Sequence, residues 1–209
     1  MPSPSELLAR RRASSPLVQC ITNLVATNIA ANVLLAAGAS PAMLHAKEES
    51  GEFAGIADAL TINIGTLSPA SVEGMKAAIA GAGAAGKPWV FDPVACFATA
   101  FRRQTAAELL ALRPTIIRGN ASEVIALGGG RSSGQGADAG DPVERAEDAA
   151  RLLARKQNAV VAVTGPVDFV TDGARAARIS GGSPLMPKVT ALGCALTCLV
   201  GALVAIAPD

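Results

Sequence analysis

Short apolar runs alternate along this chain with alanine-rich segments, and this alternation limits the possible folds more than any other feature. The apolar runs cover residues 17–21, 59–64 and 89–91, and helical patterns follow them over residues 23–37, 68–85 and 98–112. Strands that are apolar along their whole length are buried on both faces, as in a parallel sheet covered by helices. The sequence therefore predicts an α/β fold with a mostly parallel central sheet.

The same rhythm continues in the second half of the chain. A strand over residues 115–117 leads into a helix over residues 121–127, and strands over 160–163 and 168–171 follow near a sheet edge. The uncharged run 189–208 is long enough to cross a bilayer, but it contains glycines and threonines and has helical spacing of its leucines. We expect a buried helix there and no membrane partner.

The composition excludes several classes of protein. Half of the 209 residues are hydrophobic and the net charge is +1, so we expect one domain over residues 1–209 with a sizeable core. Near-neutral charge and 3% aromatic residues argue against a nucleic-acid partner. Four cysteines and one histidine are too few for a secreted disulfide scaffold or a zinc site, which favours the cytoplasm.

Two segments are predicted to lack regular structure. Residues 1–15 hold three consecutive arginines and no apolar core of a secretory signal, so we expect a frayed N-terminal arm. Residues 128–141 are rich in Gly, Ser and Asp, which predicts a mobile surface loop.

Polar residues stand where several predicted strands end. They lie in the strings VQCITN (18–23), GASPAMLHA (38–46), NIGTL (63–67) and DPV (92–94). In open α/β sheets ligands bind beyond the carboxyl ends of the strands, so these strings outline a site with Asp92 as a candidate magnesium-side carboxylate. Each also has a structural reading: Thr22 as a helix cap beside solvated asparagines, Met43 as a core residue, and Asp92 as part of a turn.

The string RGNASE (118–123) follows a predicted strand and opens a helix. Asn120 and Glu123 have the spacing of a capping box, in which each side chain bonds to the other residue's backbone N–H. The same residues with Arg118 also suit a phosphate and magnesium station. The spacing alone leaves both interpretations open.

A loop containing KVT (188–190) and ALGC (191–194) runs into the last predicted helix. Backbone N–H groups at a helix start attract anions and lower the pKa of a thiol, so Cys194 is a candidate base beside a phosphoryl group. Its structural reading is a small core residue, and Cys198, one turn further on, is expected to be packing.

Taken in order, these strings resemble the hydroxyethylthiazole kinase family, and the resemblance runs from about residue 16 to the end and includes VTG (163–165) and VDFVTDG (167–173). It implies a ribokinase-like three-layer α/β/α sandwich and ATP-dependent, Mg²⁺-dependent phosphorylation of the hydroxyl of 4-methyl-5-(2-hydroxyethyl)thiazole in thiamine biosynthesis or salvage. It also implies a homotrimer with active sites at subunit interfaces.

The resemblance assigns roles to individual residues. Cys194 takes the catalytic position, where most ribokinase-like relatives have an aspartate. The other assignments are Met43, Asn23, Ala191 and Gly193 for the substrate, Arg118, Thr164 and Asn120 for ATP, and Asp92 and Glu123 for magnesium, directly or through water.

The chain departs from the family pattern at three places. The family's Gly-Thr-Gly-Cys is ALGC here, and its glycine-rich turn after DPV is Ala95-Cys96-Phe97. Family members also continue for some tens of residues beyond Asp209, so the C-terminal helices are expected to be missing, either because the chain is a fragment or because it is a degenerate paralogue. The alternatives to an active thiazole kinase are a catalytically impaired ligand-binding paralogue and a related small-alcohol kinase.

Overall fold

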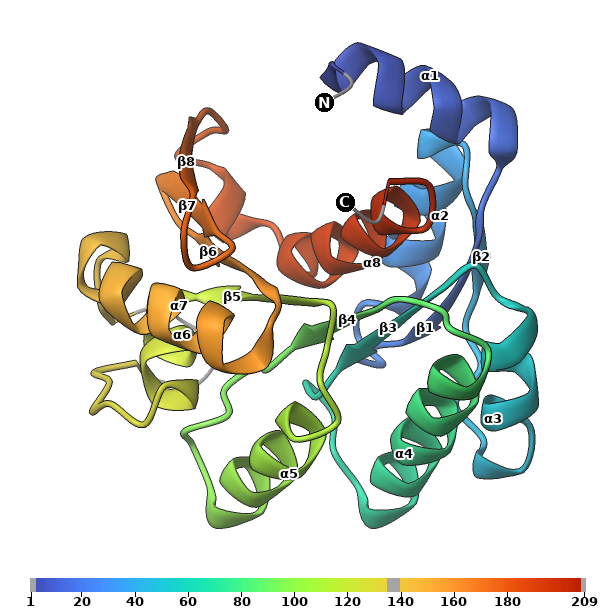
Figure 1. The fold of residues 1–209 in the computed structure, drawn as a ribbon, viewed down its shortest axis with the longest axis horizontal. Coiled ribbons are helices and arrows are strands. Elements are labelled where there is room, and N and C mark those ends of the chain that lie inside the picture. The colour runs from blue at the N-terminus through green and yellow to red at the C-terminus, as the bar shows by residue number, and fades with distance from the viewer. Residues whose placement is uncertain (1–2, 135–139, 208–209) are drawn as a thin grey trace. The chain divides into compact units, whose positions relative to one another are not determined.

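Eight strands follow the order β2-β1-β3-β4-β5-β6-β7-β8 in the computed structural model, which describes residues 3–134 and 140–207. The parallel pairs include β1 (Leu17–Ile21) with β2 (Ser40–Ala42) and with β3 (Ala59–Asn63), and β5 (Ile116–Asn120) with β6 (Val160–Thr164). The last strands, β7 (Val167–Thr171) and β8 (Ala176–Ser180), are antiparallel. The mostly parallel sheet with flanking helices confirms the predicted α/β class (Figure 1).

The chain divides into two compact units, which we describe one at a time. The first unit contains Met1–Val90 and Val189–Asp209, and the second contains Phe91–Lys188. Strand β4 (Trp89–Asp92) begins in the first and ends in the second. A single domain over residues 1–209 stays a prediction.

In the first unit, β1 has helices on both of its faces. Val18 and Cys20 are buried against residues of α2 (Thr27–Ala37) and α8 (Leu192–Val204). Gln19 points the opposite way, as alternation along a strand requires, and its amide donates to the Ser50 carbonyl of α3 (Lys47–Ile56) at 3.3 Å. Helix α4 (Pro69–Ala84) lies beside α3 (Figure 1). This unit therefore shows helix, sheet and helix as three layers.

Helix α8 forms from the run predicted to be a buried helix. Cys198 is completely buried in a cluster with Ala195 and Ala202 of the same helix, which confirms its packing role. Burying each large apolar side chain of such a cluster stabilises the fold by about 1.5–3 kcal/mol. Among residues 3–134 and 140–207, no helix is long and apolar enough to span a membrane.

The N-terminal segment differs from the prediction, because helix α1 (Pro4–Ser14) forms where a frayed arm was expected. Its first turn is capped reciprocally: the Glu6 N–H donates to Ser3 Oγ at 3.3 Å, and the Ser3 N–H donates to Glu6 Oε2 at 2.6 Å. This Ser-x-x-Glu spacing is a helix-start pattern that the sequence analysis overlooked.

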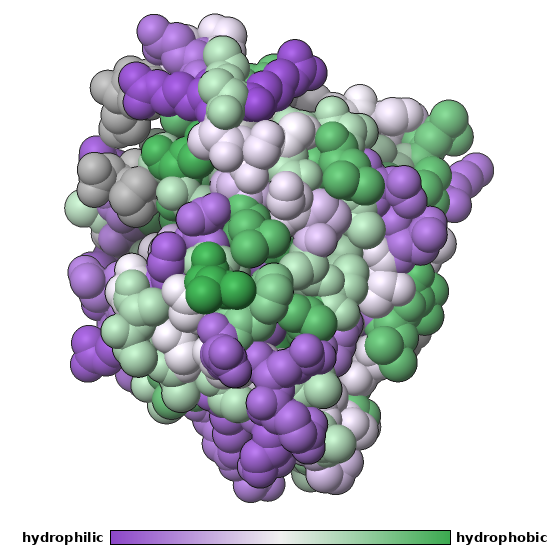
Figure 2. Space-filling view, turned by 90° about the vertical axis from the view of Figure 1, so that its right-hand side faces the viewer, coloured by the Kyte–Doolittle hydropathy of each residue, from purple (hydrophilic) through white to green (hydrophobic). Residues whose placement is uncertain are grey.

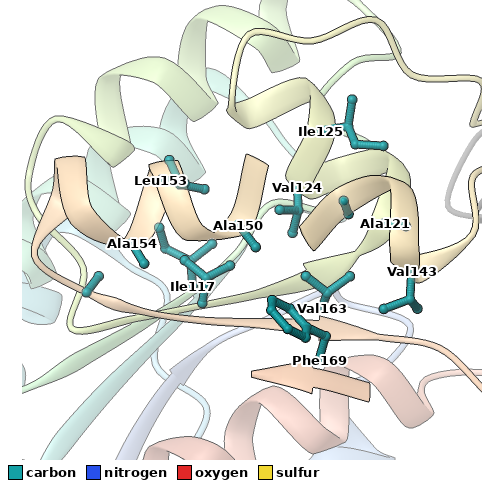
Figure 3. Packing of buried hydrophobic residues seen from close by; sticks show 13 residues of the cluster. Ile117, Ala121, Val124, Ile125, Val143, Ala150, Leu153, Ala154, Val163 and Phe169 are labelled. Atoms are coloured by element: carbon teal, nitrogen blue, oxygen red, sulfur yellow. The ribbon is translucent and has the colours of Figure 1, made fainter. Parts of the chain in front are cut away.

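The second unit has its own core between the sheet and two helices. Residues of α6 (Ala121–Leu127) and α7 (Val143–Gln157) pack with Ile117 and Val163 of the strands over Phe169 (Figure 3). The ring of Phe169 is also covered by two guanidinium groups, Arg151 and Arg178, at 5.2 and 5.3 Å from its centroid. The unit further contains α5 (Ala100–Leu110) and the 3₁₀ turn η1 (Met186–Lys188).

The predicted mobile loop over residues 128–141 is partly described, since residues 135–139 lie outside the described residues. Asp141, at its end, accepts hydrogen bonds from the Ser122 hydroxyl, the Ser133 hydroxyl and the Ser133 N–H, each at 2.8 Å. These bonds and the ion pair with Arg145 lower the pKa of Asp141, with the Ser133 N–H as the first cause. The described ends of the loop are thus tied to α6.

Candidate active site

Cys194 lies in the first turn of α8 in the first unit and is half-buried. The side-chain amide of Asn63, the last residue of β3, donates to the Cys194 sulphur at 3.3 Å. The side-chain oxygen Oδ1 of Asn63 accepts the Gly65 N–H at 2.8 Å, which turns the amide nitrogen Nδ2 toward the sulphur. Asn63 is only 2% exposed, so the donor of this hydrogen bond lies in the interior of the unit. The arrangement presents the sulphur as an acceptor at a helix start.

The predicted substrate residue Asn23 lies against the loop that follows Asn63. Gly65 has no room for a Cβ, because Asn23 Nδ2 occupies that space. The Leu24 N–H also donates to Thr66 Oγ1 at 3.0 Å, so the end of β1 and the end of β3 are tied together. The structure therefore connects Asn23 to Cys194 through Gly65 and Asn63.

Two structural readings near β1 have different outcomes. The interpretation in which Thr22 caps the next helix is wrong, because α2 begins at Thr27 with Ala26 as N-cap and no side-chain cap bond. Asn28 and Asn32, by contrast, are exposed on α2, as the solvated reading expected.

Met43 follows β2 and packs against the apolar cluster of the first unit while remaining partly exposed. Its predicted contact with substrate stays a prediction.

Ala191 has a left-handed backbone, with φ 65° and ψ 1°, at the N-cap of α8. It provides no side-chain cap bond, and Leu192 is the first helical residue. The left-handed region costs a residue with a Cβ about 1–2 kcal/mol. The chain therefore adopts a glycine-type backbone at a position where the family pattern has glycine. Gly193 follows within the helix, and its carbonyl accepts the Thr197 hydroxyl at 3.2 Å.

In the second unit, three predicted residues are in direct contact. Arg118 Nη1 lies 3.6 Å from Asp92 Oδ2, and Arg118 Nη2 donates to Thr164 Oγ1 at 2.6 Å. Asp92 is 1% exposed, at the end of β4, and a turn closes after it between the Pro93 carbonyl and the Cys96 N–H at 2.9 Å. Arg118 Nε is buried and has no hydrogen-bond partner among the described residues.

Asn120 and Glu123 form the predicted capping box of α6. Glu123 also accepts the Ala95 N–H at 2.9 Å through Oε1, while Oε2 accepts the Asn120 N–H at 2.8 Å. Burial, followed by the charge of Asp92, raises the pKa of Glu123 to about 7. A buried carboxyl that repels its neighbour in this way is stabilised by a cation.

Asp92 and Glu123 suit magnesium, which proteins bind through one or two carboxylates together with phosphate oxygens and water. No group of three or more His, Cys, Asp or Glu residues in the described part of the chain can hold a metal by itself. The two carboxylates would therefore hold the ion together with a nucleotide.

Sequence reasoning placed Asn63 and Gly65 at a polar strand end but did not name them as site residues. The role of Asn63 depends on its contact with Cys194, which is 131 positions away in the sequence. No pattern within one short window of the sequence indicates this contact. The remaining predicted residues lie at or just after strand ends or at helix starts, except that Arg118 is the middle residue of β5, which extends to Asn120 rather than ending at residue 117 as predicted.

The fold is the one that ribokinase-like kinases have. The pyridoxal kinase from Staphylococcus aureus, solved in complex with ADP, matches 90% of this chain and 79% of its own with a TM-score of 0.65 at 16% identity, which supports the fold alone. The chain belongs to the hydroxyethylthiazole kinase family, whose model matches residues 8–209.

Individual relatives agree with this assignment. The hydroxyethylthiazole kinase of Rhizobium johnstonii is 71% identical over 99% of this chain and 78% of its own length. The hydroxyethylthiazole kinase structure from Pyrococcus horikoshii is 42% identical, covers 96% of this chain and 76% of its own, and has a TM-score of 0.87.

Proposed function

We propose that this chain transfers the γ-phosphoryl group of ATP to the side-chain hydroxyl of 4-methyl-5-(2-hydroxyethyl)thiazole in thiamine biosynthesis or salvage. The observation that carries this proposal is the Cys194 sulphur at the start of α8, held by the Asn63 amide at 3.3 Å. A thiol at this position distinguishes the family from relatives that use an aspartate. Membership of the family supports the substrate.

In the first unit, the predicted site residues bind the thiazole alcohol and accept its hydroxyl proton. Asn23 and Met43 bind the thiazole, while Ala191 and Gly193 direct backbone groups at the start of α8. The hydroxyl oxygen bonds to the γ-phosphorus as the bond from that phosphorus to the ADP oxygen breaks, and the hydroxyl proton passes to the Cys194 sulphur. Asn63 orients the sulphur for this transfer.

In the second unit, the residues serve the nucleotide. Arg118, whose guanidinium contacts Thr164, binds phosphate oxygens together with that residue, and Asn120 is the N-cap of the adjoining helix α6. Asp92 and Glu123 hold magnesium, directly or through water. When bound, this ion neutralises phosphate charge.

We also propose a cytoplasmic homotrimer. Leu24 and Val25, which directly follow Asn23, are 66% and 68% exposed, and a subunit contact would cover them. Figure 2 shows hydrophobic residues in the middle of one face, with hydrophilic residues above and below. All four cysteines are reduced thiols in the described part of the chain, as in a reducing compartment. Light scattering of the purified chain measures the assembly, and a monomeric mass would contradict the trimer.

A coupled assay of ADP release tests the activity. We expect ADP release with the thiazole alcohol and magnesium, little release with a pyrimidine alcohol, and none without either component. Thiazole binding by calorimetry without ADP release would instead identify an impaired binding paralogue. Faster release with another alcohol would identify a related kinase. Ala191 argues against impairment, because its backbone has the left-handed conformation that a glycine would adopt there.

A further inference from the structure

His45, the single histidine of the chain, lies between two loops that carry predicted substrate residues. Its Nδ1 is 3.1 Å from the carbonyl oxygen of Met43, and its Nε2 is 3.3 Å from the carbonyl oxygen of Thr22. Thr22 directly precedes Asn23. One half-buried ring therefore contacts the backbone of both substrate loops of the first unit.

The ring acts where the backbone ladder between the two strands ends. Strands β1 and β2 are paired from Leu17 opposite Ser40 to Gln19 opposite Ala42. Thr22 and Met43 lie beyond this register. The contact from His45 Nε2 to the Thr22 carbonyl replaces a ladder hydrogen bond at the point where the substrate loops begin.

The backbone of His45 is itself fixed. Its carbonyl oxygen lies against Gly74 of α4 so closely that a Cβ at position 74 would collide with it. On the other side, Thr66 holds the Leu24 N–H at 3.0 Å. The imidazole thus links a segment anchored on α4 to a segment anchored on the loop after β3.

We propose that His45 is a positioning residue that sets the spacing between Asn23 and Met43 for the thiazole ring. Carbonyl oxygens only accept hydrogen bonds and a neutral imidazole carries a single N–H, so the tie to Thr22 uses the tautomer with its proton on Nε2. The contact with Met43 stays within one loop, and the contact with Thr22 ties the loops together. The inference rests on the proposed function for its substrate, but the tie itself is a property of the chain alone.

Three substitutions separate these contacts. Gln places an amide donor near the position of Nε2, Asn places one near Nδ1, and Phe keeps the ring shape without a donor. We expect His45→Phe and His45→Asn to raise the KM for the thiazole alcohol about 10-fold, equivalent to about 1.4 kcal/mol, because the hydrogen bond between the two loops is lost. His45→Gln should stay within about threefold of the unaltered chain. Neither kcat nor the KM for ATP should change more than about twofold in any variant.

Asn32→Ala is a matched control, because it also removes a side-chain hydrogen bond to a carbonyl, that of Asn28 at 2.9 Å, within one helix. It should leave both KM values unchanged. The positioning role would be overturned if the KM for ATP rose as much as the KM for the thiazole alcohol, or if His45→Phe left the KM for the thiazole alcohol unchanged. Absence of ADP release from the unaltered chain would overturn the proposed function instead.

Hydrogen exchange tests the tie without substrate. His45→Phe should speed amide exchange in residues 22–25 at least about threefold, His45→Gln should not, and residues 143–157 of α7 should be unaffected. Unchanged exchange in residues 22–25 would show that the two loops hold their spacing without the ring.

Discussion

Two turns of this molecule contain an alanine in a left-handed conformation, and they are supported differently. Ala95, after β4, has φ 50°, and Ala191, before α8, has φ 65°. Ala95 is 7% exposed and donates its N–H to Glu123 Oε1 at 2.9 Å, and Arg102 and Arg103 donate to the carbonyls of Val94 and Phe97 at 2.8 and 2.9 Å. Ala191 is more exposed, and no side chain caps the helix that it begins.

The same left-handed alanine backbone is therefore stabilised by different contacts in the two turns. Around Ala95 a carboxylate and two arginines fix the turn, so the strain is shared by a bonded cluster. At Ala191 the strain is held by α8, whose Ala195 N–H donates to the Ala191 carbonyl at 2.9 Å. The first turn adjoins the predicted metal carboxylates, and the second leads directly to the predicted base.

The largest expected effect concerns Cys194, which lies in the first turn of the helix that follows Ala191. Cys194→Ser should lower kcat about 10³-fold while changing the KM for thiazole less than about threefold, because a hydroxyl is a much poorer proton acceptor than a thiol at a helix start. Steady-state ADP release measures both. Cys198→Ala, one turn further along α8 and buried, is the matched control. Equal losses in kcat and binding would refute the base assignment.

The next effect tests the carboxylate that supports Ala95. The pKa of Glu123 is about 7 in the folded chain and 4.5 in a free side chain, so the folded chain binds the extra proton between these values. The contribution of protonated Glu123 to the free energy of unfolding is fully present below pH 4.5. This contribution is lost as the pH rises to about 7, and the loss amounts to about 3 kcal/mol.

Urea unfolding at pH 5 and pH 8, without added metal, measures this loss. Glu123→Gln should abolish the pH-dependent difference, and Asp92→Asn should reduce it, since the charge of Asp92 is the second cause of the raised pKa. A full difference in the Gln variant would show that another group titrates.

A smaller effect is expected when the Ala191 turn is returned to the family pattern. Ala191→Gly combined with Leu192→Thr restores a hydroxyl donor and a closer backbone approach, and one preorganised donor is commonly worth about 10²-fold in rate. We therefore expect kcat to rise, up to about that factor. Thiazole affinity is followed separately. A flat or lower kcat would mean that Leu192 already fits an active loop.

The smallest effect separates the two turns directly. Glycine relieves the left-handed strain at either position, but at Ala95 it also removes a buried methyl group worth about 0.8 kcal/mol. Ala191→Gly should stabilise the chain by about 0.5–1 kcal/mol, and Ala95→Gly should be nearly neutral. Thermal unfolding of both variants measures the difference. Equal increases in stability for the two variants would show that the hydrogen bonds around Ala95 and its buried methyl group make no difference to the effect of glycine.

The sequence predicts local features of this molecule better than contacts between distant segments. The strand Leu17–Ile21 and the helix Ala121–Leu127 have the predicted bounds, because apolar runs and the Asn120 and Glu123 cap are visible in one short window. Helix α7 was overlooked although its buried residues Val143, Ala146 and Ala150 recur at helical spacing, whereas the exposed strand β8 was not predicted because it has no apolar pattern.

The site is predictable in part for the same reason. Motif order identifies Cys194, Asp92 and Arg118, and the structure adds the Arg118 contacts to Asp92 and Thr164. The φ angles of Ala95 and Ala191 are set by the surrounding fold and have no counterpart in residue type, because alanine rarely adopts them. The bond from Asn63 to Cys194 likewise requires two segments far apart in the sequence to meet.

The first unit is discontinuous, and this has a consequence for synthesis on the ribosome. Its cluster around Val18 and Cys20 includes Ala195, Cys198 and Ala202, which are translated only after the whole of the second unit. A chain emerging from its N-terminus therefore has all of Phe91–Lys188 available before it has the helix that covers β1. The usual order, in which the earlier part of a protein finishes folding first, is reversed here. Until α8 emerges, the face of β1 that carries Val18 and Cys20 is covered only in part, by α2.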